Sequence, residues 1–257
     1  MKKLIKRILF GGDTAKPVPF TVPEISMPYK RETPMNETLF VHIHNPKTGG
    51  STFNSILTNN FGSLYEPIVG RYLDFIPKFR NQMVLNYIER HTTIKALSSH
   101  NFTAILPYKN DFKNIVGICF IRNPIDTFFS FYFHLRFVGG NFVETKMNLD
   151  EFIRHRTKNA RKFNGFLHRL TGVETNESFN YVKSLVENKN LYLFDTYNMD
   201  KAMSILRKDF PDYFVNEKFE IENISKKDQQ VTAAHKEAIK PFMSDYDWKL
   251  SDIAINK

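Results

Sequence analysis

Cysteine is nearly absent from this chain of 257 residues, which contains only Cys119. A chain with one thiol forms no internal disulfide, and a metal site built from several cysteines is excluded. Cys119 lies in an apolar run, where a free thiol behaves as a small buried hydrophobe. The low cysteine content favours a protein of the reducing cytoplasm.

Long apolar runs are missing from the N-terminus as well. The start, MKKLIKRILFGG, is basic, and its longest unbroken apolar run is three residues. Such a run is too short for a signal peptide or a membrane span, so we expect no transmembrane segment. Residues 13–36 are rich in proline, which predicts an extended arm. We therefore predict an N-terminal extension over residues 1–36 and one domain over residues 37–257.

Acidic residues are outnumbered, with 27 Asp and Glu against 36 Lys and Arg, which gives a formal net charge of +9. A basic balance favours anionic partners such as nucleotides, acidic glycans, nucleic acids or anionic membranes. No RNP-like, zinc-finger or helix-turn-helix pattern is present, so no nucleic acid partner is expected. Apolar residues make up 42% of the chain, a globular composition, and the length suits one α/β domain with a sizeable core.

An anion-binding loop is predicted within residues 38–52, TLFVHIHNPKTGGST. The apolar first half predicts a buried strand, and the apolar spacing after residue 52 predicts a helix. The glycines between them let backbone N–H groups approach a ligand at the positive end of that helix. Lysine adds charge and the hydroxyls add donors. The residues predicted to bind a phosphate or sulfate are Lys47, Thr48, Gly49, Gly50, Ser51 and Thr52.

A second anion-binding position is predicted where the apolar run 114–121 ends in Arg122. Near-continuous apolar runs are typical of parallel strands buried on both faces. Pro124 suits the first position of a helix, with Asn123 as its cap. Arg122 is therefore expected at the carboxyl end of a strand, where open α/β sheets bind ligands. An arginine there either binds a phosphate or pairs with a carboxylate, and Ser130 follows on the helix.

The rest of the chain alternates strand and helix patterns. Strands are predicted at residues 93–98 and 191–194, and residues 64–74 are predicted to be a loop. Helices are predicted from residue 50 to about 60 and over residues 77–91, 124–136, 148–156, 176–187, 199–210, 228–242 and 244–255. Strands separated by helices imply βαβ units. The predicted fold is therefore α/β, a P-loop-like three-layer arrangement with a central parallel sheet flanked by helices.

Four segments together resemble the carbohydrate sulfotransferases that use 3′-phosphoadenosine 5′-phosphosulfate (PAPS), typified by heparan sulfate 2-O-sulfotransferase and its bacterial relatives. They are FVHIHNPKTGGSTF, LSSHNF, ICFIRNPIDTFFSFYFHLRF and LYLFDTYNMDKAMSIL, and they span roughly residues 38–210. The pair His44–Asn45 departs from the family, which usually reads HIPKTGG. Eukaryotic Golgi members also carry a membrane anchor and often disulfides, so the resemblance favours a bacterial-type soluble enzyme in the cytoplasm.

The resemblance implies an O-sulfotransferase that moves a sulfuryl group from PAPS to a hydroxyl of an acceptor. The acceptor is expected to be a carbohydrate or another hydroxyl-bearing small molecule, and no metal is expected. Residues 47–52 would hold the 5′-phosphosulfate, with Lys47 stabilising the leaving oxygen. Arg122 and Ser130 would hold the 3′-phosphate. A late loop of the family also touches that phosphate, and residues 223–227 are its candidate here.

The same resemblance makes His100 the catalytic base, because it is the histidine ahead of the strand that ends in arginine. An imidazole with a pKa near neutrality is suited to removing the acceptor's hydroxyl proton. Glu66 and Glu89 are reserve bases. His42 and His44, on the entry strand, are expected to be packed residues.

Two other functions remain open. A P-loop kinase is suggested by residues 191–195, LYLFD, which look like a strand ending in a magnesium-binding aspartate. Against it, Lys47 precedes both glycines, whereas the nucleotide P-loop places its lysine after the second one. The other alternative is a non-enzymatic basic module that binds a glycan or nucleic acid. The basic segment 154–162 is a candidate contact for an acidic glycan, and the alternative is a solvated helix face.

Overall fold

The structure is a computed structural model that describes residues 35–67, 93–100, 102–104, 112–138, 143–158, 163, 165–216, 219 and 228–255. Three predicted features lie outside the described residues: residues 1–34 of the N-terminal extension, the helix at 77–91 with Glu89, and the loop at 223–227. Within the described ranges, no helix combines the length and the apolarity needed to cross a bilayer.

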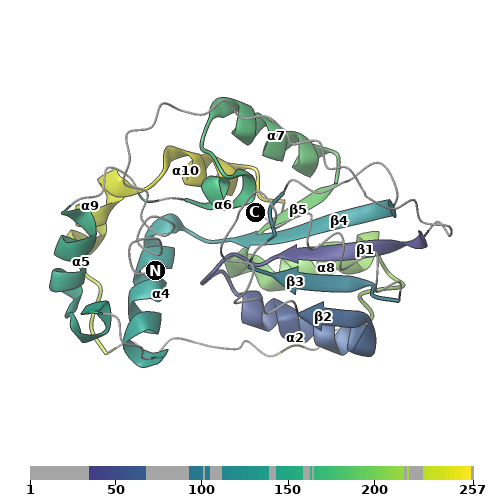
Figure 1. The fold of residues 1–257 in the computed structure, drawn as a ribbon, viewed down its shortest axis with the longest axis horizontal. Helices are drawn as coiled ribbons and strands as arrows, with labels where there is room; N and C mark the ends of the chain where they lie inside the picture. Colours follow the sequence, from purple (N-terminus) through teal and green to yellow (C-terminus); the bar gives the residue numbers. More distant parts are fainter. Residues whose placement is uncertain are drawn as a thin grey trace, which may run out of the picture.

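Five parallel strands form one sheet in the order β2–β3–β1–β4–β5 (Figure 1). The strands are β1 (Met35–Ile43), β2 (Tyr65–Pro67), β3 (Ala96–Ser99), β4 (Phe112–Ile121) and β5 (Leu191–Asp195). In the central strand, Val41 lies opposite Leu97 of β3 and Gly117 of β4. Because all strands run in one direction, their carboxyl ends meet at one edge of the sheet. The predicted α/β fold with a central parallel sheet is confirmed.

Helices cover both faces of this sheet (Figure 1). The α-helices are α2 (Gly50–Phe61), α4 (Pro124–Val138), α5 (Leu149–Thr157), α6 (Phe166–Thr171), α7 (Asn176–Glu187), α8 (Met199–Asp209), α9 (Ala233–Ile239) and α10 (Asp245–Asp252). Short 3-10 helices are η1 (Gly62–Leu64), η2 (Val143–Lys146), η3 (Thr196–Asn198) and η4 (Lys240–Phe242). α2 and α8 pack on one face and α6, α7 and α10 on the other, while α4, α5 and α9 form a third apolar cluster.

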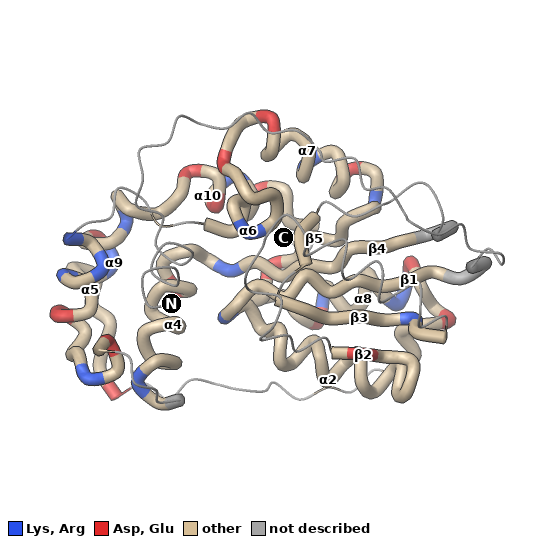
Figure 2. Tube along the Cα trace, in the orientation of Figure 1, with Lys and Arg blue, Asp and Glu red and all other residues tan. Residues whose placement is uncertain are grey.

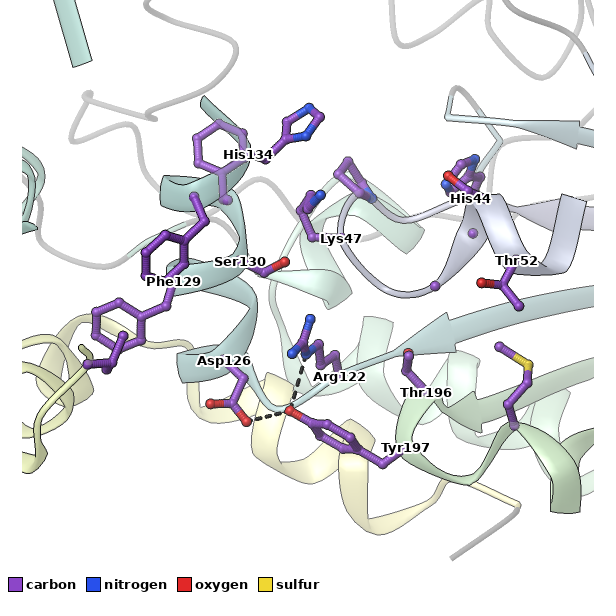
Figure 3. A pocket seen from close by; sticks show the side chains of 18 of the residues that line it. His44, Lys47, Thr52, Arg122, Asp126, Phe129, Ser130, His134, Thr196 and Tyr197 are labelled. Atoms are coloured by element: carbon purple, nitrogen blue, oxygen red, sulfur yellow. Dashed lines mark hydrogen bonds between the residues drawn. The ribbon is translucent and has the colours of Figure 1, made fainter. Parts of the chain in front are cut away.

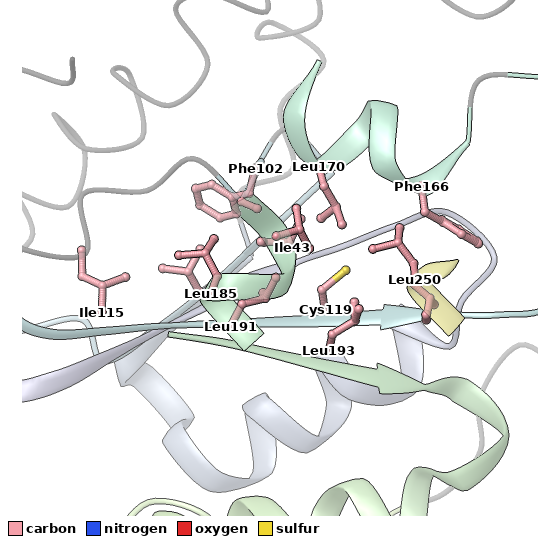
Figure 4. Close-up of a cluster of buried hydrophobic side chains, with 14 of the residues drawn as sticks. Ile43, Phe102, Ile115, Cys119, Phe166, Leu170, Leu185, Leu191, Leu193 and Leu250 are labelled. Carbon is pink, nitrogen blue, oxygen red and sulfur yellow. The ribbon is translucent and has the colours of Figure 1, made fainter. Parts of the chain in front are cut away.

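The alternation of side chains along β1 explains these layers. Leu39, Val41 and Ile43 point into the cluster formed with α6, α7 and α10 (Figure 4), and Phe40 points into the cluster formed with α2 and α8. A central strand must be apolar on both faces, which is why its sequence is a near-continuous apolar run. Cys119 of β4 belongs to the first cluster and is fully buried, and burial raises the pKa of its thiol.

Two predictions about the elements need correction. The loop predicted over residues 64–74 is wrong at its start, because Tyr65–Pro67 forms the edge strand β2 beside β3. A strand of three residues is too short to show a periodic pattern. The predicted tail helices are also too long: α9 covers only Ala233–Ile239, after the Thr232 cap, and α10 ends at Asp252 instead of residue 255. The predicted capping box of Asn148 and Glu151 is confirmed.

A buried carboxylate connects helix α10 with the start of helix α6. The Asp247 side chain on α10 is 5% exposed and accepts a hydrogen bond of 2.7 Å from the Phe166 backbone N–H at the start of α6. Burial and, to a smaller extent, the Glu174 carboxylate raise the pKa of Asp247 to about 7, although the α6 N–H groups and Arg169 oppose the shift. Folding therefore favours the protonated carboxyl, although the acceptor role suits the charged form.

We expect Asp247→Asn to flatten the pH dependence of stability. Between the ordinary aspartate pKa near 3.8 and about 7, the folded chain holds a proton that the unfolded chain has lost. The free energy of unfolding should therefore fall as pH rises across this interval, by at most about 1.4 kcal/mol per pH unit for one proton. Urea unfolding of both proteins at several pH values measures the slope. The exposed Asp245 on the same helix provides the control, Asp245→Asn; an unchanged slope in Asp247→Asn would contradict the assignment.

Candidate active site

A cavity of about 1060 Å³ opens at the carboxyl edge of the sheet, beside α4 (Figure 3). Its walls come from the loop after β1, the start of α2, the ends of β3, β4 and β5, helix α4 and the segment that leads into α9. The predicted site residues that line it are Lys47, Gly49, Gly50, Ser51, Thr52, His100, Arg122 and Ser130. Residues from three separate sequence segments therefore share one site.

The loop after β1 owes its shape to two residues with left-handed backbone conformations. Gly49 has a φ of 77°, and a Cβ added there would lie 3.0 Å from Cγ2 of Thr196. Lys47 has a φ of 65°, which is uncommon for a residue with a side chain. The turn brings the Lys47 side chain into the cavity and places Gly50 at the start of α2. The loop and the α2 N-terminus can therefore bind an anion together.

Side-chain hydrogen bonds fix this loop to the sheet. Asn45 is buried, and its Nδ2 donates to Sγ of Cys119 at 3.2 Å and to the Phe120 carbonyl at 3.4 Å. The Thr48 hydroxyl donates to the Asn45 carbonyl at 2.8 Å, and the side chain is fully buried. Thr48 is thus the one predicted anion-binding residue that does not line the cavity. Its hydroxyl maintains the turn instead of facing a ligand.

Thr196, which follows β5, is a second anchor that the sequence did not predict. Its Oγ1 lies 2.9 Å from the Thr48 carbonyl oxygen and 2.8 Å from the Ile121 carbonyl oxygen. A hydroxyl has one proton, so the two carbonyl groups share this donor. The bond connects the loop after β1 with the end of β4, on either side of the cavity floor. Position 196 follows a predicted strand, but no local motif distinguishes it.

Two cations converge on the cavity. Figure 3 shows the side chains of Lys47 and Arg122 directed toward the same space, with Ser130 between them. Burial lowers the pKa of Lys47, and the nearby charge of Arg122 lowers it further. Like charges held close together in a partly desolvated site are stabilised by a bound anion. Asn123 caps α4 as predicted, with its Oδ1 accepting the Ile125 N–H at 3.0 Å.

Arg122 is held in place by a tyrosine and an aspartate. Its Nε donates to the Tyr197 hydroxyl at 3.2 Å, and that hydroxyl donates to the Asp126 carboxylate (Figure 3). Burial and the Asp126 hydrogen bond raise the pKa of Tyr197, so the phenol keeps its proton for this donation. This series of hydrogen bonds engages Nε of Arg122, so Nη1 and Nη2 are the guanidinium nitrogens that can bind an anion in the cavity. Asp126 and Tyr197 were not predicted as site residues.

His100 extends from the end of β3 to the rim of the cavity. Its Nδ1 lies 2.7 Å from the carbonyl oxygen of His44. A carbonyl oxygen only accepts hydrogen bonds, so Nδ1 carries the proton, and Nε2 is the nitrogen of neutral His100 that can accept one. The tautomer required of a general base is therefore favoured. His42 is buried, as expected for a packed residue, whereas His44 lines the cavity.

His134 is another histidine of the cavity that the sequence reading did not single out. It lies on α4, four residues after Ser130 and eight after Asp126, so the three share one helix face. Burial lowers the pKa of His134, and the charge of Lys47 lowers it further. His134 is therefore neutral near pH 7. The helical spacing from Ser130 was a signal that could have identified it.

Three predicted alternatives find little support in the geometry. The reserve base Glu66 lies on edge strand β2 and is not among the described residues that line the cavity. Asp195, the proposed magnesium ligand, accepts the Tyr197 N–H at 2.9 Å as a cap of η3 and does not line the cavity. The side chain of Arg156, from the basic segment 154–162, is 7% exposed and packs on the Phe152 ring.

The remaining described part of that segment belongs to a surface of mixed charge. Figure 2 shows Lys and Arg along α5 and α9 with Asp and Glu among them. Arg154 and Lys158 are exposed, but His235 of α9 pairs with Asp150 of α5 at 3.1 Å. The described residues of α5 and α9 therefore present no uniformly basic face.

No protein-family model matches the chain, and a search of curated proteins finds no similar sequence. The cavity and the charges that line it are thus the basis for assigning a function.

Proposed function

We propose that the protein is a PAPS-dependent O-sulfotransferase that transfers a sulfuryl group to a hydroxyl of an acceptor such as a carbohydrate. The observation that carries the proposal is that two groups of predicted anion-binding residues, from different elements, line one cavity. One group consists of Lys47, the glycines and the α2 N-terminus, and the other consists of Arg122, directly after β4, and Ser130 on α4. PAPS carries a phosphosulfate on its 5′ side and a separate phosphate on its 3′ oxygen, which suits this pair of positions.

The reaction requires an in-line displacement at sulfur, related to phosphoryl transfer. The acceptor oxygen forms a bond to sulfur while the bond from sulfur to the bridging phosphate oxygen breaks. The hydroxyl proton passes to Nε2 of His100, whose Nδ1–H is held by a carbonyl. Negative charge develops on the leaving oxygen, where Lys47 and the N–H groups of the loop stabilise it.

A P-loop kinase is less well supported. In the nucleotide P-loop, the lysine follows the glycines and a strand-end aspartate binds magnesium through a second ligand shell. Here Lys47 precedes the glycines, and Asp195 is engaged as a helix cap. Arg122 directly follows the neighbouring strand β4, donates to the Tyr197 hydroxyl and lines the cavity.

Arg122→Ala tests the second anion-binding position. We expect it to weaken adenosine 3′,5′-bisphosphate binding by about tenfold to a hundredfold, because charge-assisted contacts contribute about 1.5–3 kcal/mol. Binding of adenosine 5′-monophosphate should hardly change, since it lacks the 3′ group. Calorimetry with both nucleotides on both proteins provides the comparison. The proposal fails if wild type binds the two nucleotides equally, or if Arg122→Ala weakens both equally.

Tyr197→Phe is a graded companion to this substitution. It keeps the ring and the charge of Arg122 but removes the hydroxyl that accepts from Nε. We expect the same selective loss for the 3′,5′-bisphosphate, at only a few-fold, because Arg122 keeps its charge and loses only one contact that orients it. Binding of ATP with magnesium to wild type distinguishes a kinase from a sulfotransferase. Tighter binding of ATP than of adenosine 3′,5′-bisphosphate would favour the kinase.

A further inference from the structure

His44 is the residue that interrupts the otherwise familiar loop motif, and it contacts His100 in two ways. Its carbonyl oxygen accepts from Nδ1 of His100 at 2.7 Å. Its ring stacks on the His100 ring, with centroids 3.9 Å apart and planes inclined by 28°. A backbone carbonyl alone leaves the imidazole free to rotate about its side-chain bonds, whereas a stacked ring restricts that rotation.

The stack continues into the core. The His42 ring lies 5.1 Å from the His44 ring at an angle of 17°, and its Nδ1 lies 2.9 Å from Oγ of Ser98 and 3.0 Å from Oδ1 of Asn54. His42 is 1% exposed, so the buried end of the stack is fixed. The three imidazole rings thus form a column from the interior of the sheet to the cavity rim.

Gly50 provides the space that the His44 ring occupies. A Cβ at position 50 would collide with the imidazole of His44. The second glycine of the loop therefore has a role besides admitting a ligand: it lets this side chain lie against the first turn of α2. The backbone N–H of His44 also donates to the Ser99 carbonyl at 3.0 Å, which fixes His44 beside the residue that precedes His100.

The column remains uncharged below its outermost ring. Burial, together with His42 and His100, lowers the pKa of His44 to about 2. Burial, together with His100, lowers the pKa of His42 to about 3, although the hydrogen bond with Asn54 opposes this shift. The groups that interact with His100 include both of these histidines, while Lys47, Arg122 and Asp126 carry charge elsewhere in the cavity. A neutral ring beneath His100 imposes no like-charge penalty when His100 takes up a proton.

We propose that His44 is a positioning residue for the base: its stacked ring and its carbonyl together hold His100 in the tautomer with Nδ1 protonated and Nε2 unprotonated. The role of His100 as a base rests on the proposed function. The stacking of His44 on His100 and the tautomer of His100 are properties of the protein without ligand. The pair His44–Asn45 before Pro46 therefore has a structural role, because it places the ring and the carbonyl of His44 beside His100 at the end of β3.

NMR correlation of the imidazole nitrogens and protons in isotopically labelled full-length protein distinguishes the two tautomers. In wild type we expect His100 to be protonated on Nδ1. In His44→Ala, which keeps the carbonyl and removes the ring, we expect a mixture of both tautomers. His44→Phe restores an aromatic face and should restore the Nδ1–H form. His44→Leu is a second ring-free variant that fills more of the space, and His155→Ala on α5 is a matched control.

An Nε2–H tautomer of His100 in wild type overturns the proposal, and so does an unchanged tautomer population in both ring-free variants. Calorimetry with adenosine 3′,5′-bisphosphate on the same samples separates this outcome from a failure of the proposed function. If wild type does not bind the bisphosphate while the tautomers respond as expected, the sulfotransferase assignment fails and the positioning role stands. Retained bisphosphate binding in His44→Ala also shows that this variant folds.

Discussion

Replacing Lys47 with alanine should reduce the rate of sulfuryl transfer by about thirtyfold to a thousandfold. Nζ reaches the cavity from a loop held rigidly by Asn45 and Thr196, so its charge is preorganised at the leaving oxygen. Removing one such electrostatic donor costs about 2–4 kcal/mol of transition-state stabilisation. Affinity for the donor should fall less, because the loop N–H groups remain and charge develops chiefly in the transition state.

The measurement uses radiolabelled PAPS with an acceptor found by screening hydroxyl compounds, and calorimetry gives donor affinity. Lys208→Ala, on the exposed side of α8, serves as a charge-matched control. The transition-state role of Lys47 would be excluded by near wild-type turnover in Lys47→Ala. A loss of affinity as large as the loss of turnover would instead indicate uniform binding of substrate and transition state.

Replacing His100 with alanine should lower turnover by about a hundredfold to ten-thousandfold, the usual contribution of a general base. Binding of adenosine 3′,5′-bisphosphate should remain close to that of wild type, because the base contacts the acceptor hydroxyl and not the nucleotide. The acidic limb of the pH–rate profile should also disappear, since protonation of His100 no longer limits the reaction.

His134→Ala is the matched test of His134, a further histidine that lines the cavity besides His100. Its position beside Lys47 makes it the strongest rival base among the described residues. If His134→Ala loses the acidic limb while His100→Ala keeps it, the base has been assigned to the wrong side of the cavity. If both variants retain the limb, neither His100 nor His134 acts as the base, and Glu66 or Glu89 must be tested next.

Local chemistry made much of the fold predictable. β1, β4 and β5 were recognisable because a strand buried on both faces requires a continuous apolar run. α7 was predicted with the bounds that the structure has, because its amphipathic pattern is regular and Thr175 caps it. β2 escaped notice because an edge strand of three residues depends on its neighbour β3 rather than on its own sequence.

The residues of the candidate site also differ in how far their roles could be predicted from the local sequence. Gly49 and Arg122 could be predicted because a left-handed turn and a strand end have local signatures. Thr196 and Tyr197 could not, because their roles arise only when β5 is brought beside the loop after β1, whereas His134 had a local signal in its helical spacing from Ser130. The buried orientation of the Thr48 side chain is instead a local effect, because its hydroxyl donates to the Asn45 carbonyl within the same turn.

The left-handed backbone conformation of Lys47 lowers the stability of the loop, but it places a positive charge in the cavity. A residue with a side chain in this region is less stable than glycine by about 1 kcal/mol, and glycine would adopt the same turn without that strain. Selection for thermal stability alone would therefore favour glycine at position 47 and remove Nζ from the cavity. Variants chosen for robustness are at risk of losing the charge there, so position 47 should be held fixed in any stabilisation of this protein.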